Sequence, residues 1–201
     1  MLTPNKNYRL KGSILTLAAI MNWCWSAPCQ SADAGMDVTL NANIVENTCQ
    51  ISIANNGKVS LPTVSKSWFY NVDGTTRLQP TDDAGGTPFA VKIDNCPLDD
   101  QVPQKFIFSF QPQSKEWPES TRQVFINETS VAAGGADNTG VVIFSKAHNT
   151  NVLSSEGNSS VELVANEKWG TEYPFYARLQ NTGAVSVGKV TSRVLVNAIY
   201  E

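Results

Sequence analysis

A short stretch near the start of the chain, residues 35–44, alternates between apolar and polar positions. Its apolar positions are Met36, Val38, Leu40, Ala42 and Ile44. A period of two is typical of a half-buried β-strand, whereas an amphipathic helix needs a period of 3.6. The stretch therefore predicts a strand with one apolar face, and that face must be buried against some body of structure.

The rest of the chain predicts short strands that are separated by turn residues. Alternating or strongly β-favouring segments cover residues 48–54, 58–61, 87–96, 105–110, 123–126, 141–144, 149–153, 160–164, 172–180 and 189–201. Asn55-Asn56-Gly57 is a hairpin-type turn signal, and residues 63–86 are irregular. No segment of ten or more residues carries a helical period. This pattern favours one all-β domain built as an antiparallel sandwich.

The last predicted strand is apolar on both faces. One face carries Val194, Val196, Ala198 and Tyr200, and the other face carries two further aliphatic residues. Such a strand suits the interior of a sandwich, but no later residue pairs with its far edge. Exposed apolar edges aggregate and are normally covered. The chain thus has an N-terminal strand with no sheet to join and a C-terminal strand with an unpaired edge. We expect the N-terminal strand of one molecule to pair with the C-terminal strand of another.

The first 34 residues have the pattern of a signal peptide. Three basic residues precede an apolar segment, residues 13–25, and Ala32-Asp33-Ala34 fits a small-x-small cleavage site. We expect cleavage after Ala34, with Ser31 as the alternative site. An uncleaved membrane anchor is the competing interpretation, but the segment is short for a bilayer and Asn22 interrupts it. We therefore expect residues 1–34 to be removed during export.

Charge and length narrow the classes of partner. Removing residues 1–34 takes away three of the 15 basic residues and one of the 18 acidic residues, which leaves a net charge of −5 (12 − 17). A mildly acidic chain without a basic patch argues against nucleic acid or anionic lipid as a partner. About 167 residues remain, enough for one domain with its own core.

Two cysteines, Cys49 and Cys96, remain after the signal peptide is removed. In an oxidising compartment such a pair forms one disulfide by default. That bond would close a loop of about fifty residues and stabilise the fold by ~4 kcal/mol in the chain-entropy model. No other ligand stands near either cysteine at metal-binding spacing, so we expect neither a zinc site nor a redox motif.

Residues that carry catalysis in other proteins are isolated in this chain. His148 is the only histidine and stands in a polar turn, and no G-x-S-x-G context marks a nucleophile. The Asp82-Asp83 and Asp99-Asp100 pairs lack calcium-loop spacing and are better explained as solvated loop charges. We expect no enzyme activity, no catalytic residue, no cofactor, no metal site and no small-molecule substrate.

Several features together resemble the pilin subunits of the chaperone–usher pathway, of the type 1 fimbrial kind. In chain order they are an arm that ends at Val45, a cysteine pair, the blocks 138–144 and 174–179, and Gly188 twelve residues before a penultimate Tyr200. The similarity covers essentially the whole mature chain. Each motif is weak alone, but their order makes the set specific.

The resemblance implies an incomplete immunoglobulin-like β-sandwich, residues 47–201, preceded by an N-terminal donor-strand arm, residues 35–46. Subunits of this family lack their last strand, and a periplasmic chaperone lends a strand to the groove beside the C-terminal strand. At an outer-membrane usher the arm of the next subunit replaces it. By resemblance the donor residues are Met36, Val38, Leu40, Ala42 and Ile44. The groove or chaperone-recognition residues are Gly188, Val194, Val196, Ala198 and Tyr200. Family arms usually carry Gly where this chain has Ala42.

The resemblance predicts a structural subunit (shaft, adaptor or minor pilin) of an adhesive cell-surface fimbria that is exported through the periplasm. Its partners would be the chaperone, the usher and neighbouring fimbrial subunits. The alternative is a secreted carbohydrate-binding β-sandwich adhesin module that acts as a monomer. In that case Trp68, Tyr70, Trp117 and Trp169 would stack on sugars. A binding module should fold alone, whereas a pilin should aggregate or polymerise without its chaperone.

Overall fold

The computed structural model describes residues 36–42, 49–96, 104–165 and 171–200, with the backbone alone for residues 36, 37, 41 and 42. The predicted signal peptide lies outside these ranges, as do Ile44, Asp99, Asp100 and Trp169. Within the described ranges no helix has the length and apolar character that crossing a membrane requires.

The regular structure of the described residues consists of β-strands and three short 3-10 helices. The strands are β1 (Met36–Ala42), β2 (Gln50–Ile53), β3 (Lys58–Leu61), β4 (Thr87–Asn95), β5 (Lys105–Pro112), β6 (Phe125–Ile126), β7 (Thr139–Ser145), β8 (Thr150–Asn151), β9 (Val161–Val164), β10 (Glu172–Asn181) and β11 (Thr191–Tyr200). The 3-10 helices are η1 (Asn55–Gly57), η2 (Lys66–Phe69) and η3 (Val131–Ala133).

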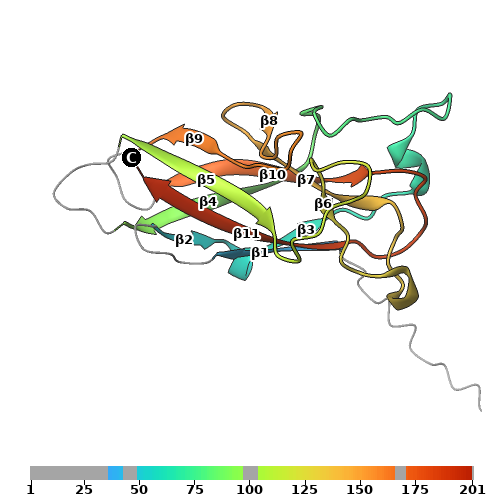
Figure 1. The fold of residues 1–201 in the computed structure, drawn as a ribbon, viewed down its shortest axis with the longest axis horizontal. Coiled ribbons are helices and arrows are strands. Elements are labelled where there is room, and N and C mark those ends of the chain that lie inside the picture. Colours follow the sequence, from blue (N-terminus) through green and yellow to red (C-terminus); the bar gives the residue numbers. More distant parts are fainter. Residues whose placement is uncertain (1–35, 43–48, 97–103, 166–170, 201) are drawn as a thin grey trace, which may run out of the picture. The chain divides into compact units, whose positions relative to one another are not determined.

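The strands form two sheets that pack face to face (Figure 1). One sheet has the order β3-β1-β11-β5-β9, and the other has the order β2-β4-β10-β7-β6, with β8 paired to β7. Apart from the parallel β1–β11 pair, the strand pairs are antiparallel. The predicted all-β sandwich is confirmed, and each predicted strand segment overlaps a strand of the structure.

The core lies between the two sheets and is rich in aromatic side chains. Alternate residues of β5 (Phe106, Phe108 and Phe110) are buried against β10, where Phe106 contacts Tyr173 and the other two contact Phe175. The ring centroids of Phe110 and Phe175 are 5.0 Å apart in an edge-to-face arrangement, which aromatic quadrupoles favour. This period-two burial follows from the pleat, because successive side chains of a strand point to opposite faces.

The disulfide predicted between Cys49 and Cys96 is confirmed. It joins the residue before β2 to the residue after β4, two neighbouring strands of the same sheet. Both cysteines are buried and belong to the core. The bond therefore ties the start of the sandwich domain to the first long strand of the second sheet.

The irregular segment between β3 and β4 is held against the sheet by polar side chains of β10. Arg178 Nη2 donates hydrogen bonds to the carbonyl oxygens of Gln79 (2.8 Å) and Asp82 (2.6 Å). Gln180 Nε2 donates to the carbonyl oxygen of Leu78 (2.7 Å). Both side chains alternate with core residues of β10 and are buried under the segment that they hold. The conformation of this segment thus depends on tertiary contacts rather than on a local pattern.

Candidate functional site

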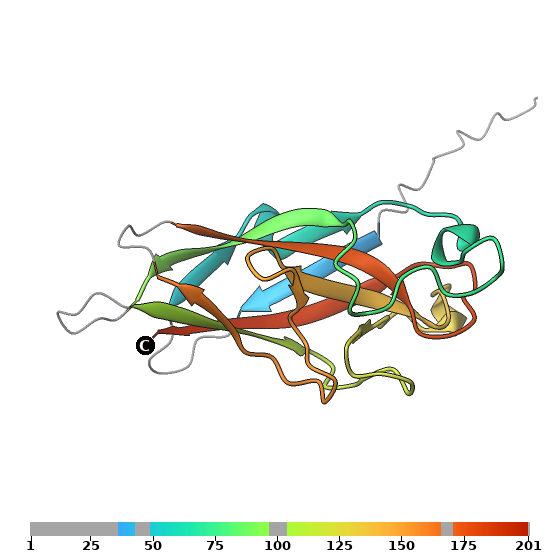
Figure 2. The ribbon, with the colours of Figure 1, turned by 90° about the horizontal axis from the view of Figure 1, so that it is seen from above.

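The site expected at the two ends of the chain is a groove between β3 and β11, and β1 of the same chain occupies it. In Figure 2 the blue β1 strand lies beside the red β11 strand. β1 pairs in parallel with β11 from Asp37↔Thr191 to Ala42↔Val196. On its other side it pairs antiparallel with β3 from Met36↔Leu61 to Thr39↔Lys58. Without β1 the sheet would be open at this point, because β3 and β11 pair only through it.

The groove is apolar where the side chains of β1 are described. Val38 and Leu40 are 1% and 4% exposed, whereas Thr39 between them is half-buried. Leu40 stands opposite Val194, which is fully buried, and Val38 stands opposite Val59 of β3. Burial of each aliphatic side chain contributes ~1.5–3 kcal/mol, so these two residues anchor the strand. The alternation that predicts a half-buried strand is confirmed at these positions.

One end of β1 meets a glycine at very close range. Gly57, the last residue of η1, has a φ of +77°, and a Cβ at this position would overlap the carbonyl oxygen of Leu40. Glycine adopts positive φ without a steric penalty and lets two backbones approach. Further along, Cys49 N donates a hydrogen bond to Ala198 O (3.0 Å), so the sandwich domain itself begins beside the far end of β11. The groove is therefore bounded by backbone at this end.

The structure locates most of the residues predicted for this site. Met36 and Ala42 belong to β1, with Ala42 in register with Val196, while Ile44 lies outside the described residues. Among the predicted groove residues, Val194, Val196 and Ala198 are buried on β11, and Tyr200 is half-buried against the core. Gly188 differs, because it lies in the loop before β11 rather than on the strand. A Cβ there would overlap the backbone of Gly135 and Ala136, so Gly188 is required for loop packing.

An apolar cavity lies beyond the Met36 end of β1, between the segment that follows β3 and the loop that precedes β11. It has a volume of about 320 Å³ and is lined from one side by Val64 and Phe69 and from the other by Val185 and Val190. Sequence reasoning missed this cavity, because its walls come from segments far apart in the sequence: residues 63–69, residues 185–190, Gly134, Ala136, Thr139 of β7 and Leu179 of β10. It extends the groove past the part that β1 fills.

The residues considered for other chemistry have structural partners. His148 Nε2 donates to the carbonyl oxygen of Glu162 (2.7 Å). Asp82 Oδ2 accepts a hydrogen bond from the amide of Gln79 (2.7 Å). No cluster of three metal-ligating side chains occurs within the described ranges. Of the aromatics proposed to stack on sugars, Trp68 packs edge-on against Phe69 and Trp117 stacks on Phe125.

Comparisons with known proteins agree on one class. The chain is 31% identical over 208 residues to the uncharacterized fimbrial-like protein YadK of Escherichia coli (strain K12), which covers 98% of this chain and 99% of YadK. It is 28% identical over 185 residues to the major fimbrial subunit SMF-1 of Stenotrophomonas maltophilia (strain K279a), covering 87% of this chain and 98% of SMF-1.

Two other comparisons are less informative. No protein-family model matches the chain. The solved structure of the CupB6 tip adhesin from Pseudomonas aeruginosa superposes with a TM-score of 0.39 at 8% identity, over 83% of this chain and 39% of the adhesin chain.

Proposed function

The chain belongs to the fimbrial-like protein family, whose members are non-enzymatic subunits, and from this membership we propose that it polymerises into a surface fimbria by donor-strand exchange. In this proposal it is a shaft, adaptor or minor subunit. The arm, residues 35–46, enters the groove of a neighbouring subunit, and the groove between β3 and β11 receives the arm of another.

The observation that carries the proposal is the filled groove. An alternating strand lies between β3 and β11 with backbone pairing on both sides and with Val38 and Leu40 buried. In β-strand addition the main-chain ladder supplies affinity and alternate side-chain pockets supply register. A groove with both features accepts a strand of matching pattern, whether that strand comes from the same chain or from another.

The short connection to the domain fixes the direction of the chain's own arm. Six residues, 43–48, link Ala42 to Cys49. The amide of Cys49 donates a hydrogen bond to the carbonyl oxygen of Ala198, so Cys49 lies beside Ala198. In an antiparallel orientation Ala42 would stand near Thr191, ~23 Å of strand away from Ala198. Seven Cα–Cα steps reach at most ~25 Å when fully extended, which leaves no slack for the turn. The chain's own arm therefore runs parallel to β11.

A neighbour's arm carries no such tether and can run antiparallel to β11. Antiparallel pairs have straighter hydrogen bonds and are slightly more stable per residue than parallel pairs. The apolar cavity beyond β1 offers this second strand a place to bind first, while β1 still occupies the rest of the groove. Replacement of the parallel arm by an antiparallel one is then the assembly step.

A periplasmic chaperone and an outer-membrane usher complete the proposal. A chaperone strand in the groove would compete with β1 for the same edges of β3 and β11, and it would keep the arm available for the next subunit. The route through the periplasm to the cell surface belongs to the same proposal, and it rests on the predicted signal peptide and on the family.

The test separates donor from acceptor. A chain that lacks residues 35–44 keeps its groove but has no arm, so with a chaperone it should stay soluble and fail to extend a fibre. A synthetic peptide of residues 35–46 should bind this truncated chain, and the same peptide with Leu40→Asp should not, because the substitution places a charge in an apolar site. Normal fibres from the truncated chain, or equal binding of the two peptides, would refute the donor role.

The oligomeric state of the isolated chain, which the sequence suggests as a test, does not separate a pilin from a monomeric adhesin. The chain's own arm closes the groove, so a pilin of this sequence can also exist alone as a closed monomer. Being monomeric therefore does not distinguish the two functions. Binding of the arm peptide by the truncated chain does, because only the pilin function requires an acceptor groove.

A further inference from the structure

The described residues include five large hydrophobic side chains that are exposed, and these lie at two opposite ends of the sandwich. At the first end, here called the loop end, β3 and β10 finish and β11 begins. At the second end, here called the C-terminal end, β4, β9 and β11 finish. Val72, Val131 and Val187 are each more than half exposed at the loop end, and Val164 and Ile199 are exposed at the C-terminal end. Exposed apolar side chains that are confined to two ends indicate contact surfaces.

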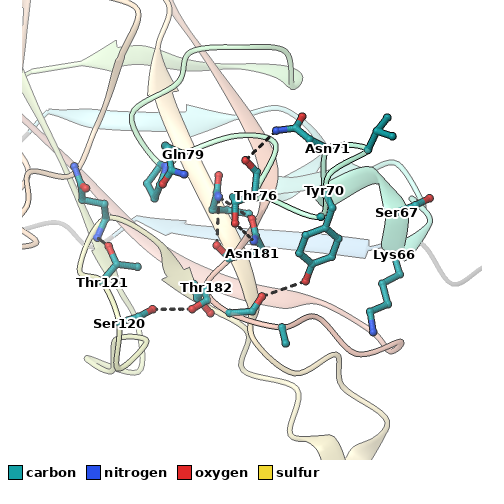
Figure 3. A pocket seen from close by; sticks show the side chains of 17 residues that line it. Lys66, Ser67, Tyr70, Asn71, Thr76, Gln79, Ser120, Thr121, Asn181 and Thr182 are labelled. Carbon is teal, nitrogen blue, oxygen red and sulfur yellow. Dashed lines mark hydrogen bonds between the residues drawn. The ribbon is translucent and has the colours of Figure 1, made fainter.

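Hydrogen bonds join the three loops that carry the valines of the loop end. Tyr70 Oη donates to the carbonyl oxygen of Gly183 (3.3 Å) and accepts from the amide of Val185 (2.9 Å), which ties the loop after η2 to the loop between β10 and β11. Figure 3, a view of the polar depression between these loops, shows the bond that Tyr70 donates. The amide of Lys189 donates to the carbonyl oxygen of Gly134 (2.9 Å), which ties the same loop to η3. The three valines therefore belong to one connected surface.

The short tether of the arm determines which surface of a neighbour meets the loop end. In the proposed exchange a neighbour's arm runs antiparallel to β11, so its Ala42 stands near Thr191, at the loop end of the acceptor. Seven Cα–Cα steps from Ala42 to Cys49 reach at most ~25 Å. Cys49 is hydrogen-bonded to Ala198 and so lies at the C-terminal end of its own domain. The C-terminal end of the neighbour must therefore come close to the loop end of the acceptor.

The closed monomer leaves both sets of apolar side chains exposed. Its own arm runs parallel to β11, so the tether stays at the C-terminal end and brings no second domain to the loop end. Val164 and Ile199 point away from the core, because Leu163 and Ala198 next to them are buried. Removal of these side chains from water by a neighbouring domain is favourable.

We propose that the loop end of each subunit docks on the C-terminal end of the neighbour whose arm fills its groove. In this contact Val72, Val131 and Val187 of the acceptor pack against the surface that carries Val164 and Ile199 of the donor. The proposal rests on strand exchange as the proposed function and adds contact between domains to the pairing of strands. Such a contact is heterologous, head to tail, so it repeats along a fibre without closing into a ring.

Chemical crosslinking tests the geometry of the contact. Lys66 and Lys189 lie at the loop end, whereas Lys92 and Lys105 lie near the C-terminal end. Fibres are assembled from an equal mixture of unlabelled and ¹⁵N-labelled mature chain and treated with an amine-reactive crosslinker. Crosslinks between chains of different label should join a lysine of the loop end to a lysine of the C-terminal end. Crosslinks that join two loop ends, or none between opposite ends, would overturn the head-to-tail contact.

Substitutions at the two ends test the contribution of the contact to assembly. Val187→Asp and Val164→Asp each place a carboxylate on an exposed position, so the fold should be unaffected while removal of the side chain from water becomes unfavourable. Each variant should raise the critical concentration for fibre assembly about tenfold. Uptake of the synthetic peptide of residues 35–46 should be unchanged, because the peptide carries no domain to dock. The control Ala147→Asp, at an exposed position of the turn between β7 and β8, should change neither measurement.

The peptide separates failure of the docking from failure of strand exchange. Normal peptide uptake together with fibres that both Asp variants form at the wild-type concentration overturns the docking and leaves strand exchange intact. A wild-type chain that takes up no peptide and forms no fibre overturns strand exchange, and the docking with it. If one of the Asp variants does not fold, the other variant and the crosslinks decide the question.

Discussion

The contact between Gly57 and β1 allows the docking of the arm to be tested by a single substitution, Gly57→Ala, which adds one methyl group at this contact. Gly57 has a φ of +77°, and an added Cβ would overlap the carbonyl oxygen of Leu40. Gly74 has a φ of +82°, and an added Cβ there would find no atom within 4 Å. Alanine at either site suffers the same backbone strain, but only at position 57 does it also meet β1. Gly74→Ala is thus a matched control for Gly57→Ala.

The structure sets the size of the two effects. A non-glycine residue in the left-handed region costs ~1–2 kcal/mol, and both variants should lose this much free energy of unfolding. The extra loss in Gly57→Ala cannot exceed the docking energy of the arm, because β1 can leave the groove and relieve the overlap. Burial of Val38 and Leu40 contributes ~3–6 kcal/mol to that docking energy, and the backbone pairing of β1 with β3 and β11 adds to it.

Two measurements check this prediction. Urea unfolding should place Gly57→Ala well below Gly74→Ala in free energy of unfolding, with the difference bounded by the docking energy. Hydrogen exchange should show faster exchange of the β1 amides in Gly57→Ala and unchanged exchange in Gly74→Ala. Equal destabilisation of the two variants, together with equal β1 protection, would refute the reasoning that Gly57 admits the arm.

Three further predictions concern the domain itself. Replacing Cys49 or Cys96 by Ser should lower the free energy of unfolding by ~4 kcal/mol, because the disulfide closes a loop with a sequence separation of 47. Equal urea midpoints of wild type and variant under oxidising conditions would contradict this prediction. Burial raises the pKa of the Tyr176 phenol above its ordinary 10.0, so its contribution to stability is complete below pH 10.0 and is lost as the pH rises through the folded value. Tyr176→Phe should flatten this alkaline loss in urea titrations, and an unchanged slope would count against it. Gly188→Ala should lower the melting temperature of the isolated chain, because the added Cβ overlaps backbone atoms of Gly135 and Ala136. A variant that melts like wild type but fails to bind a chaperone would instead show that Gly188 serves chaperone recognition.

Local patterns predicted those parts of the fold that local chemistry determines. The alternation from Met36 to Ala42 predicts β1, and two nearly continuous apolar faces predict that β11 lies inside the sandwich. The cysteine pair predicts its disulfide from compartment and number alone. Each of these signals depends on side-chain period or residue type, which the sequence displays directly.

The remaining features arise from contacts between distant residues. The segment between β3 and β4 takes its shape from Arg178 and Gln180, about a hundred residues away, so no local pattern could predict it. Gly188 appears in the sequence as part of a terminal signature, while its packing against Gly135 becomes visible only in three dimensions. The structure also differs from the expected exchange between molecules, because β1 occupies the groove of its own chain. The alternating pattern of the arm specifies an apolar groove, but it does not specify whether that groove belongs to the same chain or to a neighbour.

The closed monomer sets a quantitative condition for assembly. A short tether gives the chain's own arm an effective concentration in the millimolar range, whereas neighbouring subunits at micromolar concentration compete at a disadvantage of about a thousandfold. Each factor of ten is worth ~1.4 kcal/mol, so a neighbour's arm must bind more tightly by ~4 kcal/mol. Two additional aliphatic anchors at ~1.5–3 kcal/mol each would supply that difference. The apolar cavity beyond β1 offers room for at least one, and antiparallel pairing with β11 adds to it. A donor arm that fails to fill this cavity should therefore leave the subunit closed on itself.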